Sequence, residues 1–263
     1  MIGAMIGDIV GSRFEFYNHK SKNFNFFDKR CFFTDDTVMT LAVAKTLLKF
    51  DAVTDIKEFK KELVAVMHEV GIKYPNCGYG GHFGVWIRGN HTEPYNSYGN
   101  GSAMRVSPVA WYANSLDECE ALAAATAEVT HSHPEGIKGA VAVAGAIYLA
   151  RTKHSIAEIK EYICSFYKID FTLDEIRDTY GFYETCQESV PQALEAFFES
   201  VSFEDAIRNA ISIGGDTIAA ITGSIAEAYY GIEDKMRTTA FSYLDSYLLE
   251  IAESFYVKFI RSK

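Results

Sequence analysis

The sequence predicts an all-α protein organised as one domain over residues 1–263, and three observations support this fold class. Apolar residues recur on one helical face after the acidic segment at residues 34–36 and again after Asp216. Pairs of Ser or Thr with Glu three residues later mark further helix starts. Alternating strand patterns are scarce, and no stretch between the helical segments reads as a linker.

Individual helices follow from these start signals. The apolar residues 1–10 are interpreted as the first core helix, because they lack the basic n-region of a signal peptide and include Asp8. First-turn prolines are expected ahead of residues 137–149 and 193–198. The start signals are Ser115 with Glu118, Ser155 with Glu158, Thr172 with Glu175, the looser pair Ser202 with Asp205, and the prolines Pro134 and Pro191.

Composition argues against several classes of function. With 263 residues, 48% of them apolar and 23% charged, the chain can form one large core or two small ones in a soluble protein. A net charge of −10 without a basic stripe argues against nucleic acid as a partner. No apolar run approaches the roughly 18 residues of a membrane span. Five scattered cysteines without a C-x-x-C pair fit reduced thiols and hence a cytoplasmic location.

Two short acidic segments carry the densest oxygen-ligand chemistry, Thr34-Asp35-Asp36-Thr37 and Gly214-Gly215-Asp216-Thr217. Each directly precedes an apolar helical run. Carboxylates and threonine hydroxyls suit Mg²⁺ or Mn²⁺, and a helix N-terminus holds such side chains in a fixed direction. The alternative is helix capping alone, for which Asp and Thr are usual residues. A cap needs one acceptor, whereas residues 34–36 crowd three oxygen-bearing side chains into one turn, which favours a shared cation.

Two stretches resist a helical interpretation, residues 17–33 and 74–103, and we expect both to form rims of an active-site cleft. In the second stretch, glycines 99 and 101 would let a ligand approach backbone N–H groups closely. Ser97 and Asn100 can hydrogen-bond phosphate or ribose, and Tyr98 offers a ring on which a base can stack. The alternative for Asn100-Gly101 is a plain turn.

Histidines and acidic residues elsewhere allow structural interpretations. His131 and His133 precede a helical run, but no third N or S ligand has a suitable spacing for zinc, so a capping or ligand-contacting imidazole is expected. Asp8 and Glu15 lie seven positions apart, near one helical face. From the sequence alone, Asp8 is interpreted as holding buried backbone or Arg13, and Glu15 as a solvated charge.

Five motifs occur in a fixed order: Gly-Asp-x-x-Gly-x-x-x-Glu, Phe-Thr-Asp-Asp-Thr-x-Met, Tyr-Gly-Asn-Gly-x-Ala-Met-Arg, Thr-His-x-His-Pro, and Gly-Gly-Asp ahead of Gly-Ser-Ile-Ala-Glu-Ala-Tyr-Tyr-Gly. Together they closely resemble the ADP-ribosylglycohydrolases, a family that includes the dinitrogenase reductase activating glycohydrolases. The resemblance runs from Gly3 to Gly231.

The resemblance implies an orthogonal bundle of helices with a two-metal Mg²⁺ or Mn²⁺ centre at the base of a cleft for ADP-ribose. The implied reaction is hydrolysis of an ADP-ribosylated protein or a small ADP-ribosyl compound, which releases ADP-ribose. The roles carried over are metal binding by Thr34, Asp35, Asp36, Asp216 and Thr217, catalysis by Glu15 and Asp35, and substrate binding by Ser97, Tyr98, Gly99, Asn100, Gly101, Ser102 and His131.

One departure from the family pattern concerns the second metal segment. The family usually has Gly-Gly-Asp-x-Asp-Thr, whereas residues 214–217 are two residues shorter and lack one carboxylate. Either Asp216 replaces the second aspartate and one metal is held more weakly, or the helix start shifts and the centre fails to form. Two alternatives therefore stand beside the hydrolase. One is an ADP-ribose-binding or structural relative without turnover, with a defective second metal site, and the other is a Mg²⁺-dependent phosphohydrolase, although the apolar strand runs expected of the latter are absent.

Overall fold

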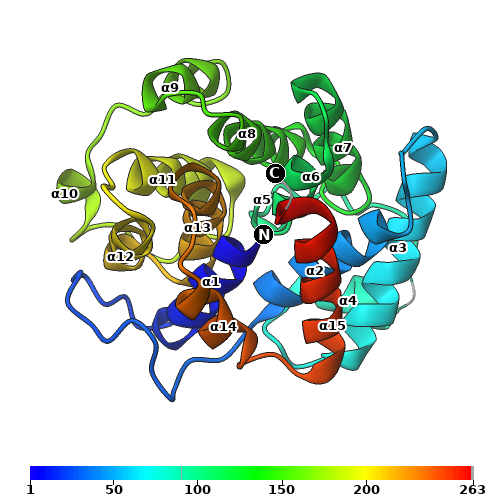
Figure 1. The fold of residues 1–263 in the computed structure, drawn as a ribbon, viewed down its shortest axis with the longest axis horizontal. Coiled ribbons are helices and arrows are strands. Elements are labelled where there is room, and N and C mark those ends of the chain that lie inside the picture. The colour runs from blue at the N-terminus through cyan, green and yellow to red at the C-terminus, as the bar shows by residue number, and fades with distance from the viewer. Residues whose placement is uncertain (90, 262–263) are drawn as a thin grey trace.

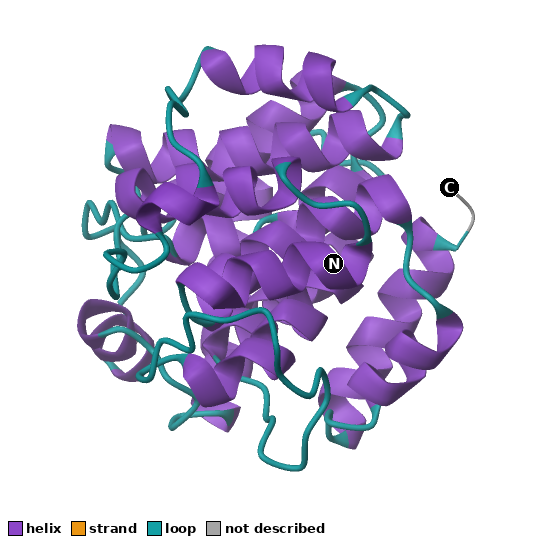
Figure 2. Ribbon diagram, turned by 90° about the vertical axis from the view of Figure 1, so that its left-hand side faces the viewer, coloured by secondary structure: helices purple, strands orange, loops and turns teal. Residues whose placement is uncertain are grey.

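The computed structural model describes residues 1–89 and 91–261, and over these residues the chain is helical and has no β-sheet. Figure 2 shows helices joined by loops, and the one β-type pairing in the described part is an isolated bridge between Gly99 and Thr185. The predicted all-α fold class is confirmed. The elements are α1 (Ile2–Gly11), the 3₁₀ turn η1 (Ser12–Phe14), α2 (Asp35–Leu48), α3 (Ile56–Lys73), α4 (Gly81–Arg88), α5 (Gly101–Met104), α6 (Ser107–Tyr112), α7 (Leu116–Glu128), α8 (Pro134–Arg151), α9 (Ile156–Cys164), α10 (Leu173–Ile176), α11 (Cys186–Phe198), α12 (Phe203–Ile213), α13 (Asp216–Tyr230), α14 (Asp234–Phe241), α15 (Ser246–Phe255) and the π-helical turn η2 (Tyr256–Ile260).

The first and thirteenth helices form a closely packed pair near the centre of the molecule (Figure 1). Helix α1 has glycine at every fourth position, Gly3, Gly7 and Gly11, and this stripe faces α13. A Cβ atom on Gly7 would lie 2.0 Å from the carbonyl oxygen of Ala219, and one on Gly11 would lie 2.5 Å from the Cα atom of Asp216. Backbones approach this closely only where side chains are missing. The glycine stripe therefore brings α1 against the N-terminus of α13.

Helix α2 begins beside this pair, and two contacts fix its first turn. Thr34 is the N-cap residue, and its Oγ1 accepts a hydrogen bond from the N–H of Asp36 at 3.4 Å. The N–H of Asp35 donates to the carbonyl oxygen of Cys77 at 2.8 Å, which holds the loop after α3 over the helix start. The acidic residues 35 and 36 thus lie in the first helical turn, as the sequence predicts.

Most of the predicted helix starts are confirmed. The apolar N-terminal segment forms α1, and Pro134 is the first residue of α8. At four predicted starts the Ser or Thr side chain accepts a hydrogen bond from the N–H three residues later. At Ser155 and Thr172 the Glu side chain also accepts from the N-cap N–H, which completes the capping box. These four caps are Ser115, Ser155, Thr172 and Ser202.

The predicted helix start at Pro191 is wrong, because α11 begins five residues earlier at Cys186. Tertiary contacts extend the helix toward its N-terminus. The N–H of Cys186 donates to the carbonyl oxygen of Tyr98 at 3.0 Å, and the N–H of Asn100 donates to the carbonyl oxygen of Glu184 at 2.7 Å. A pairing with a segment nearly ninety residues away leaves no local signal in the sequence.

The two expected loop regions differ in outcome. Residues 17–33 contain no helix, as predicted. The region 74–103 includes the eight-residue helix α4 and the start of the short helix α5, so the expectation of a continuous loop is wrong there. Helix α4 buries Phe83, Trp86 and Ile87 against the core, and this apolar face outweighs the glycines around it.

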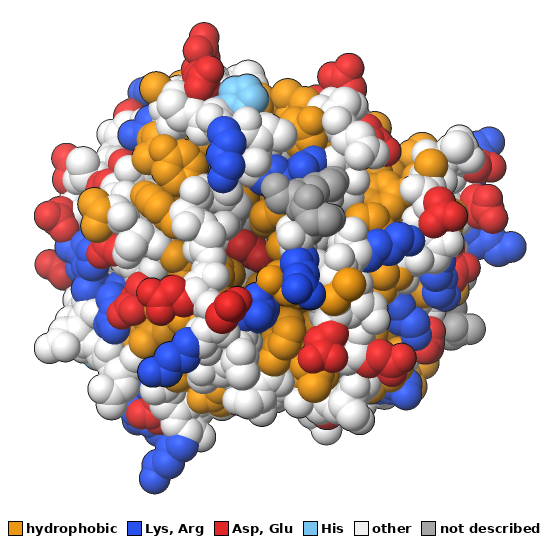
Figure 3. Space-filling view, viewed as in Figure 1, with side chains coloured by type: hydrophobic (Ala, Val, Ile, Leu, Met, Phe, Trp, Pro, Cys, Tyr) orange, Lys and Arg blue, Asp and Glu red, His pale blue; other side chains and the backbone are white. Residues whose placement is uncertain are grey.

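The helices share one contiguous apolar core, to which α1, α2, α8 and α13 each contribute several buried side chains. Acidic and basic side chains are intermingled on the face shown in Figure 3. Among the described residues, no helix combines the length and the apolar character that a membrane span requires. All five cysteines are free thiols, as the sequence predicts.

Candidate active site

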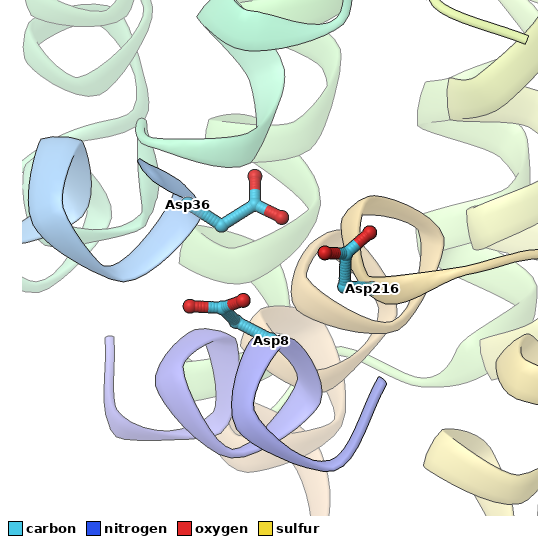
Figure 4. Close-up of side chains that lie close together, drawn as sticks. All are labelled: Asp8, Asp36 and Asp216. Carbon is cyan, nitrogen blue, oxygen red and sulfur yellow. The ribbon is translucent and has the colours of Figure 1, made fainter. Parts of the chain in front are cut away.

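Three carboxylates from three different helices converge at one place: Asp8 of α1, Asp36 of α2 and Asp216 of α13. One oxygen atom of each lies within 4.8 Å of the others, and all three side chains are buried. Figure 4 shows the carboxylates facing a common space between the helices. The packing of α1 against α13 and the start of α2 thus unites the two acidic segments that the sequence singles out.

Asp8 holds the first turn of α2 in place. Its Oδ2 accepts hydrogen bonds from the N–H groups of Thr34 at 2.9 Å and Thr37 at 3.0 Å, and its Oδ1 accepts one from the Thr34 hydroxyl at 2.6 Å. This agrees with the interpretation that Asp8 holds buried backbone. Because three of its acceptor positions are occupied, Asp8 orients α2 and offers little open ligand capacity.

Asp36 and Asp216 retain open acceptor capacity. Oδ2 of Asp36 accepts a hydrogen bond from the Thr217 hydroxyl at 3.2 Å, and Oδ1 of Asp216 accepts one from the N–H of Thr217 at 2.9 Å. Oδ1 of Asp36 is buried and has no hydrogen-bond partner among the described residues. A buried carboxylate oxygen normally has a donor or a cation beside it.

Burial and mutual repulsion shift the acidity of the cluster. Burial, followed by the negative charges of Asp216 and Asp8, raises the pKa of Asp36 well above its usual range. Burial and then the charge of Asp8 raise the pKa of Asp216 in the same way. Burial and the charge of Asp8 also raise the pKa of Asp35 to about 7. A cation between these groups would stabilise their ionised forms.

The donor set fits a hard divalent cation such as Mg²⁺ or Mn²⁺. Asp36 and Asp216 supply carboxylate oxygens, and the hydroxyls of Thr34 and Thr217 lie beside them. The proton of the Thr34 hydroxyl points to Asp8, so a lone pair on Thr34 Oγ1 remains for a cation. The unpartnered oxygen of Asp36 is the observation that most directly supports this fit.

A pocket adjoins the carboxylate cluster. Glu15, the residue after η1, lines it together with Asp35, and burial followed by the charge of Asp8 raises the pKa of Glu15. The walls come from three loop regions that are distant in the sequence. The lining residues are Glu15, Asp35, Gly78, Gly80, Gly81, His82, Phe83, Tyr95, Ser97, Gly99, Asn100, Gly101, Met104, Arg105, His131, Tyr180, Gly181, Phe182, Tyr183, Glu184, Gly214, Gly215, Asp216, Thr217 and Ile218.

Comparison with known proteins decides the family. A family model described as ADP-ribosylglycohydrolase matches residues 1–260. The chain belongs to the ADP-ribosylglycohydrolase family. It is therefore an enzyme of the glycosidase class that acts on ADP-ribosyl linkages.

Two curated relatives and one solved structure illustrate the relationship. The chain is 27% identical to the ADP-ribosylhydrolase ARH3 of Mus musculus, over 77% of this chain and 70% of that protein. It is 25% identical to the ADP-ribosyl-[dinitrogen reductase] glycohydrolase of Rhodospirillum rubrum, over 76% of this chain and 70% of that protein. A chain from an "ADP-ribosylglycohydrolase-related protein complex" superposes with a TM-score of 0.67 at 22% identity, covering 97% of this chain and 96% of the other. This superposition supports the orthogonal helical fold that the motifs imply.

In this ADP-ribosylglycohydrolase, most of the residues singled out from the sequence line this same pocket. Those lining it are Glu15, Asp35, Ser97, Gly99, Asn100, Gly101, His131, Asp216 and Thr217. Thr34 is buried against Asp8 and Asp36 is buried beside Asp216, and neither residue lines the pocket.

Tyr98 and Ser102 lie apart from the pocket lining. Tyr98 is 49% exposed, and its ring contacts His133, so it does not face the pocket. Ser102 is fully buried, and its hydroxyl donates to the carbonyl oxygen of Gly136 at 2.7 Å. The Ser102 hydroxyl therefore connects α5 to α8.

The segment 180–184 is a wall of the pocket that sequence reasoning missed. The Asn100 side-chain amide donates to the carbonyl oxygen of Tyr183 at 3.3 Å and to the Ser189 hydroxyl at 3.0 Å. These bonds hold residues 180–184 against residues 99–101. The tyrosines and the glycine of residues 180–183 are the sequence feature that could have indicated this wall.

None of residues 17–33 lines the pocket, so the expectation that this segment forms a rim is wrong. Instead, Lys20 donates to the carbonyl oxygen of Ile213 at 3.0 Å.

The shortened segment contributes one carboxylate to the cluster. Gly215 is the N-cap residue of α13, and Asp216 is its first helical residue. A Cβ atom on Gly215 would lie 3.1 Å from the Cα atom of Glu15, so glycine allows the two segments to touch. The segment thereby brings Asp216 into the cluster and supports the backbone of Glu15.

Proposed function

We propose that this enzyme hydrolyses the N- or O-glycosidic bond of an ADP-ribosylated protein side chain or of a small ADP-ribosyl compound, with Mg²⁺ or Mn²⁺ as cofactor, and releases ADP-ribose. The observation that carries this proposal is the buried carboxylate cluster, with its unpartnered Asp36 oxygen, beside a pocket whose lining includes Glu15 and Asp35. The family membership supports the class of bond.

The cation would be held by Asp36 and Asp216, with the hydroxyls of Thr34 and Thr217 and the neighbouring Asp35 as further oxygen donors. When bound, such a cation supplies positive charge that attracts and orients the hydroxyls of the ribose. We infer that Asp8 keeps the donors in place, because it bonds two N–H groups and the hydroxyl at the start of α2.

Glu15 is proposed to transfer the proton that bond cleavage requires. It lines the pocket together with Asp35, and burial followed by the charge of Asp8 raises its pKa, which favours a carboxyl group that can donate a proton. In the same site, Asp35 has a pKa of about 7 in the absence of a cation, so cation binding would convert it to the ionised form. Two carboxyl groups in different protonation states are the arrangement that glycoside hydrolysis uses.

Another part of the pocket lining is proposed to hold the diphosphate and ribose. Ser97, Gly99, Asn100, Gly101 and His131 line this side of the pocket. Glycine at positions 99 and 101 leaves room for close approach of a ligand to the backbone, and His131 presents a ring nitrogen there.

The direct test is release of free ADP-ribose from an arginine-ADP-ribosylated protein and from a serine-ADP-ribosylated peptide. The enzyme is assayed with Mn²⁺ or Mg²⁺, with EDTA, and with EDTA followed by excess metal. Release that EDTA abolishes and metal restores is the expected result. Metal-independent release would contradict the cofactor assignment. Binding of ADP-ribose without release from either substrate would favour the relative that binds but does not turn over.

A further inference from the structure

Three buried side chains form a hydrogen-bonded chain at the pocket: Arg105, Thr130 and His131. Arg105 is 1% exposed, and its Nη2 donates to the carbonyl oxygen of Thr126 at 2.9 Å and to the hydroxyl of Thr130 at 2.7 Å. The same hydroxyl lies 2.7 Å from Nδ1 of His131. The chain thus runs from a buried guanidinium to an imidazole that lines the pocket.

The positions of the protons follow from what each group can do. A guanidinium can only donate, so Thr130 Oγ1 accepts from Arg105. Among the described residues, Nδ1 of His131 is the remaining partner of that oxygen. The hydroxyl proton therefore has one acceptor, Nδ1 of His131. Since Nδ1 accepts, the ring proton of the neutral imidazole lies on Nε2.

The Nε2 edge of His131 faces open space that two glycines provide. A Cβ atom on Gly101 would lie 3.0 Å from Nε2, and one on Gly99 would lie 3.5 Å from it. Neither glycine has a positive φ angle, so space rather than backbone conformation explains their presence. No described residue makes a hydrogen bond with Nε2. The donor is therefore free for a ligand in the pocket.

The charge of Arg105 has no carboxylate partner within ion-pair distance among the described residues. Its Nε atom is buried without a hydrogen-bond partner, and Arg105 is one of the residues that line the pocket. Burial, followed by this positive charge, lowers the pKa of His131 well below its usual range, which keeps the imidazole neutral. An uncompensated cation behind a neutral donor favours an anionic oxygen in front of it.

We propose that Arg105 and Thr130 are positioning residues that hold His131 with its proton on Nε2, so that the imidazole donates to a phosphate oxygen of the bound ADP-ribosyl group. The identity of this ligand rests on the proposed function. The arrangement of the protons does not, because it follows from the protein alone.

Long-range ¹H–¹⁵N NMR of the metal-free protein at pH 7 tests the proton arrangement directly. The His131→Gln variant assigns the signals of His131 among those of the seven histidines. We expect wild-type His131 to carry its proton on Nε2. Thr130→Val should release the ring to a mixture of tautomers, while Thr130→Ser, which keeps the hydroxyl, should match the wild type. Thr126→Val is the control, because the Thr126 hydroxyl is also buried but donates to the Ala123 carbonyl oxygen at 2.8 Å.

Calorimetric titration with ADP-ribose tests the role toward the ligand. Thr130→Val should weaken binding about tenfold, the equivalent of one hydrogen bond to a charged group, whereas Thr130→Ser and Thr126→Val should stay near the wild type. Arg105→Met should lose the fixed tautomer as well; if that variant does not fold, Thr130→Val decides the matter. A proton on Nδ1 in the wild type, or a Thr130→Val variant equal to the wild type in tautomer and affinity, would overturn the proposal. A wild-type protein that binds no ADP-ribose would contradict the proposed function. The ¹H–¹⁵N spectrum would still show which nitrogen of His131 carries the proton, so the two failures can be distinguished.

Discussion

The glycine stripe of α1 allows a specific test of how the metal cluster is assembled. Replacing Gly7 with alanine places a Cβ atom 2.0 Å from the carbonyl oxygen of Ala219, 2.3 Å from its carbonyl carbon and 2.6 Å from the N atom of Ala220. All three are backbone atoms inside α13, so no side chain can move aside. Relief of this clash requires the two helices to separate.

The size of the movement follows from these distances. Ordinary contact begins at 3.4 Å, so α1 must move by about 1.4 Å from α13. Asp8 is the next residue of α1, so the same movement displaces its carboxylate relative to the α2 N–H groups that it bonds at 2.9 and 3.0 Å. Overpacking of this kind costs about 1–3 kcal/mol. Alanine recovers about 0.5–1 kcal/mol of helix propensity.

We therefore expect Gly7→Ala to lose about 1–2 kcal/mol of unfolding free energy, measured by urea denaturation. Its melting temperature should fall by about 2–8 °C, and its Mn²⁺ affinity should fall with it. Gly84→Ala is the matched control, since a Cβ atom there meets only the flexible guanidinium of Arg88, at 3.2 Å and beyond. This control should be as stable as the wild type or slightly more stable. Unchanged stability and Mn²⁺ affinity in Gly7→Ala would refute the reasoning.

Three further predictions concern the carboxyl groups. Glu15→Gln should keep ADP-ribose affinity and lose about 10²–10⁴-fold in turnover, measured by calorimetry and by the release assay; full activity would remove Glu15 from its proposed role. Asp36→Asn should raise the melting temperature in EDTA, because one of several repelling charges is gone, and should abolish the stabilisation by Mn²⁺; a normal Mn²⁺ response would show that Asp36 is not a ligand. The raised pKa values of Asp35, Asp36 and Asp216 mean that the folded state binds more protons than the unfolded state, so in EDTA stability should fall as pH rises from 5 through about 7 to 8. The melting temperature of the wild type should fall more steeply with rising pH than that of Asp36→Asn, and equal pH dependences would contradict this prediction.

Much of the fold could be predicted because its signals are local. A capping Ser or Thr and the Glu that follows it act within one turn, so helix starts such as Ser155 and Thr172 can be read from four residues. The helix start at Cys186 could not be read this way, because distant backbone bonds to residues 98–100 determine it. The same pairing brings residues 180–184 to the pocket, where no local pattern places them.

The same contrast between local signals and distant contacts applies to the candidate site. The side chains with oxygen-ligand chemistry could be recognised from the sequence, since Asp35, Asp36 and Asp216 lie in the first turns of helices, which orient them. The glycine spacing of α1 is also visible in the sequence, but its role in helix packing follows only from its position opposite α13.

Tertiary structure alone decided what Asp8 and the Arg105–Thr130–His131 chain do. Asp8 became the anchor of α2 because α1, packed against α13 through its glycine stripe, lies where the Asp8 oxygens accept from the N–H groups of Thr34 and Thr37. Hydrogen bonds act only over about 3 Å, so residues far apart in the chain take such roles only after the core has packed.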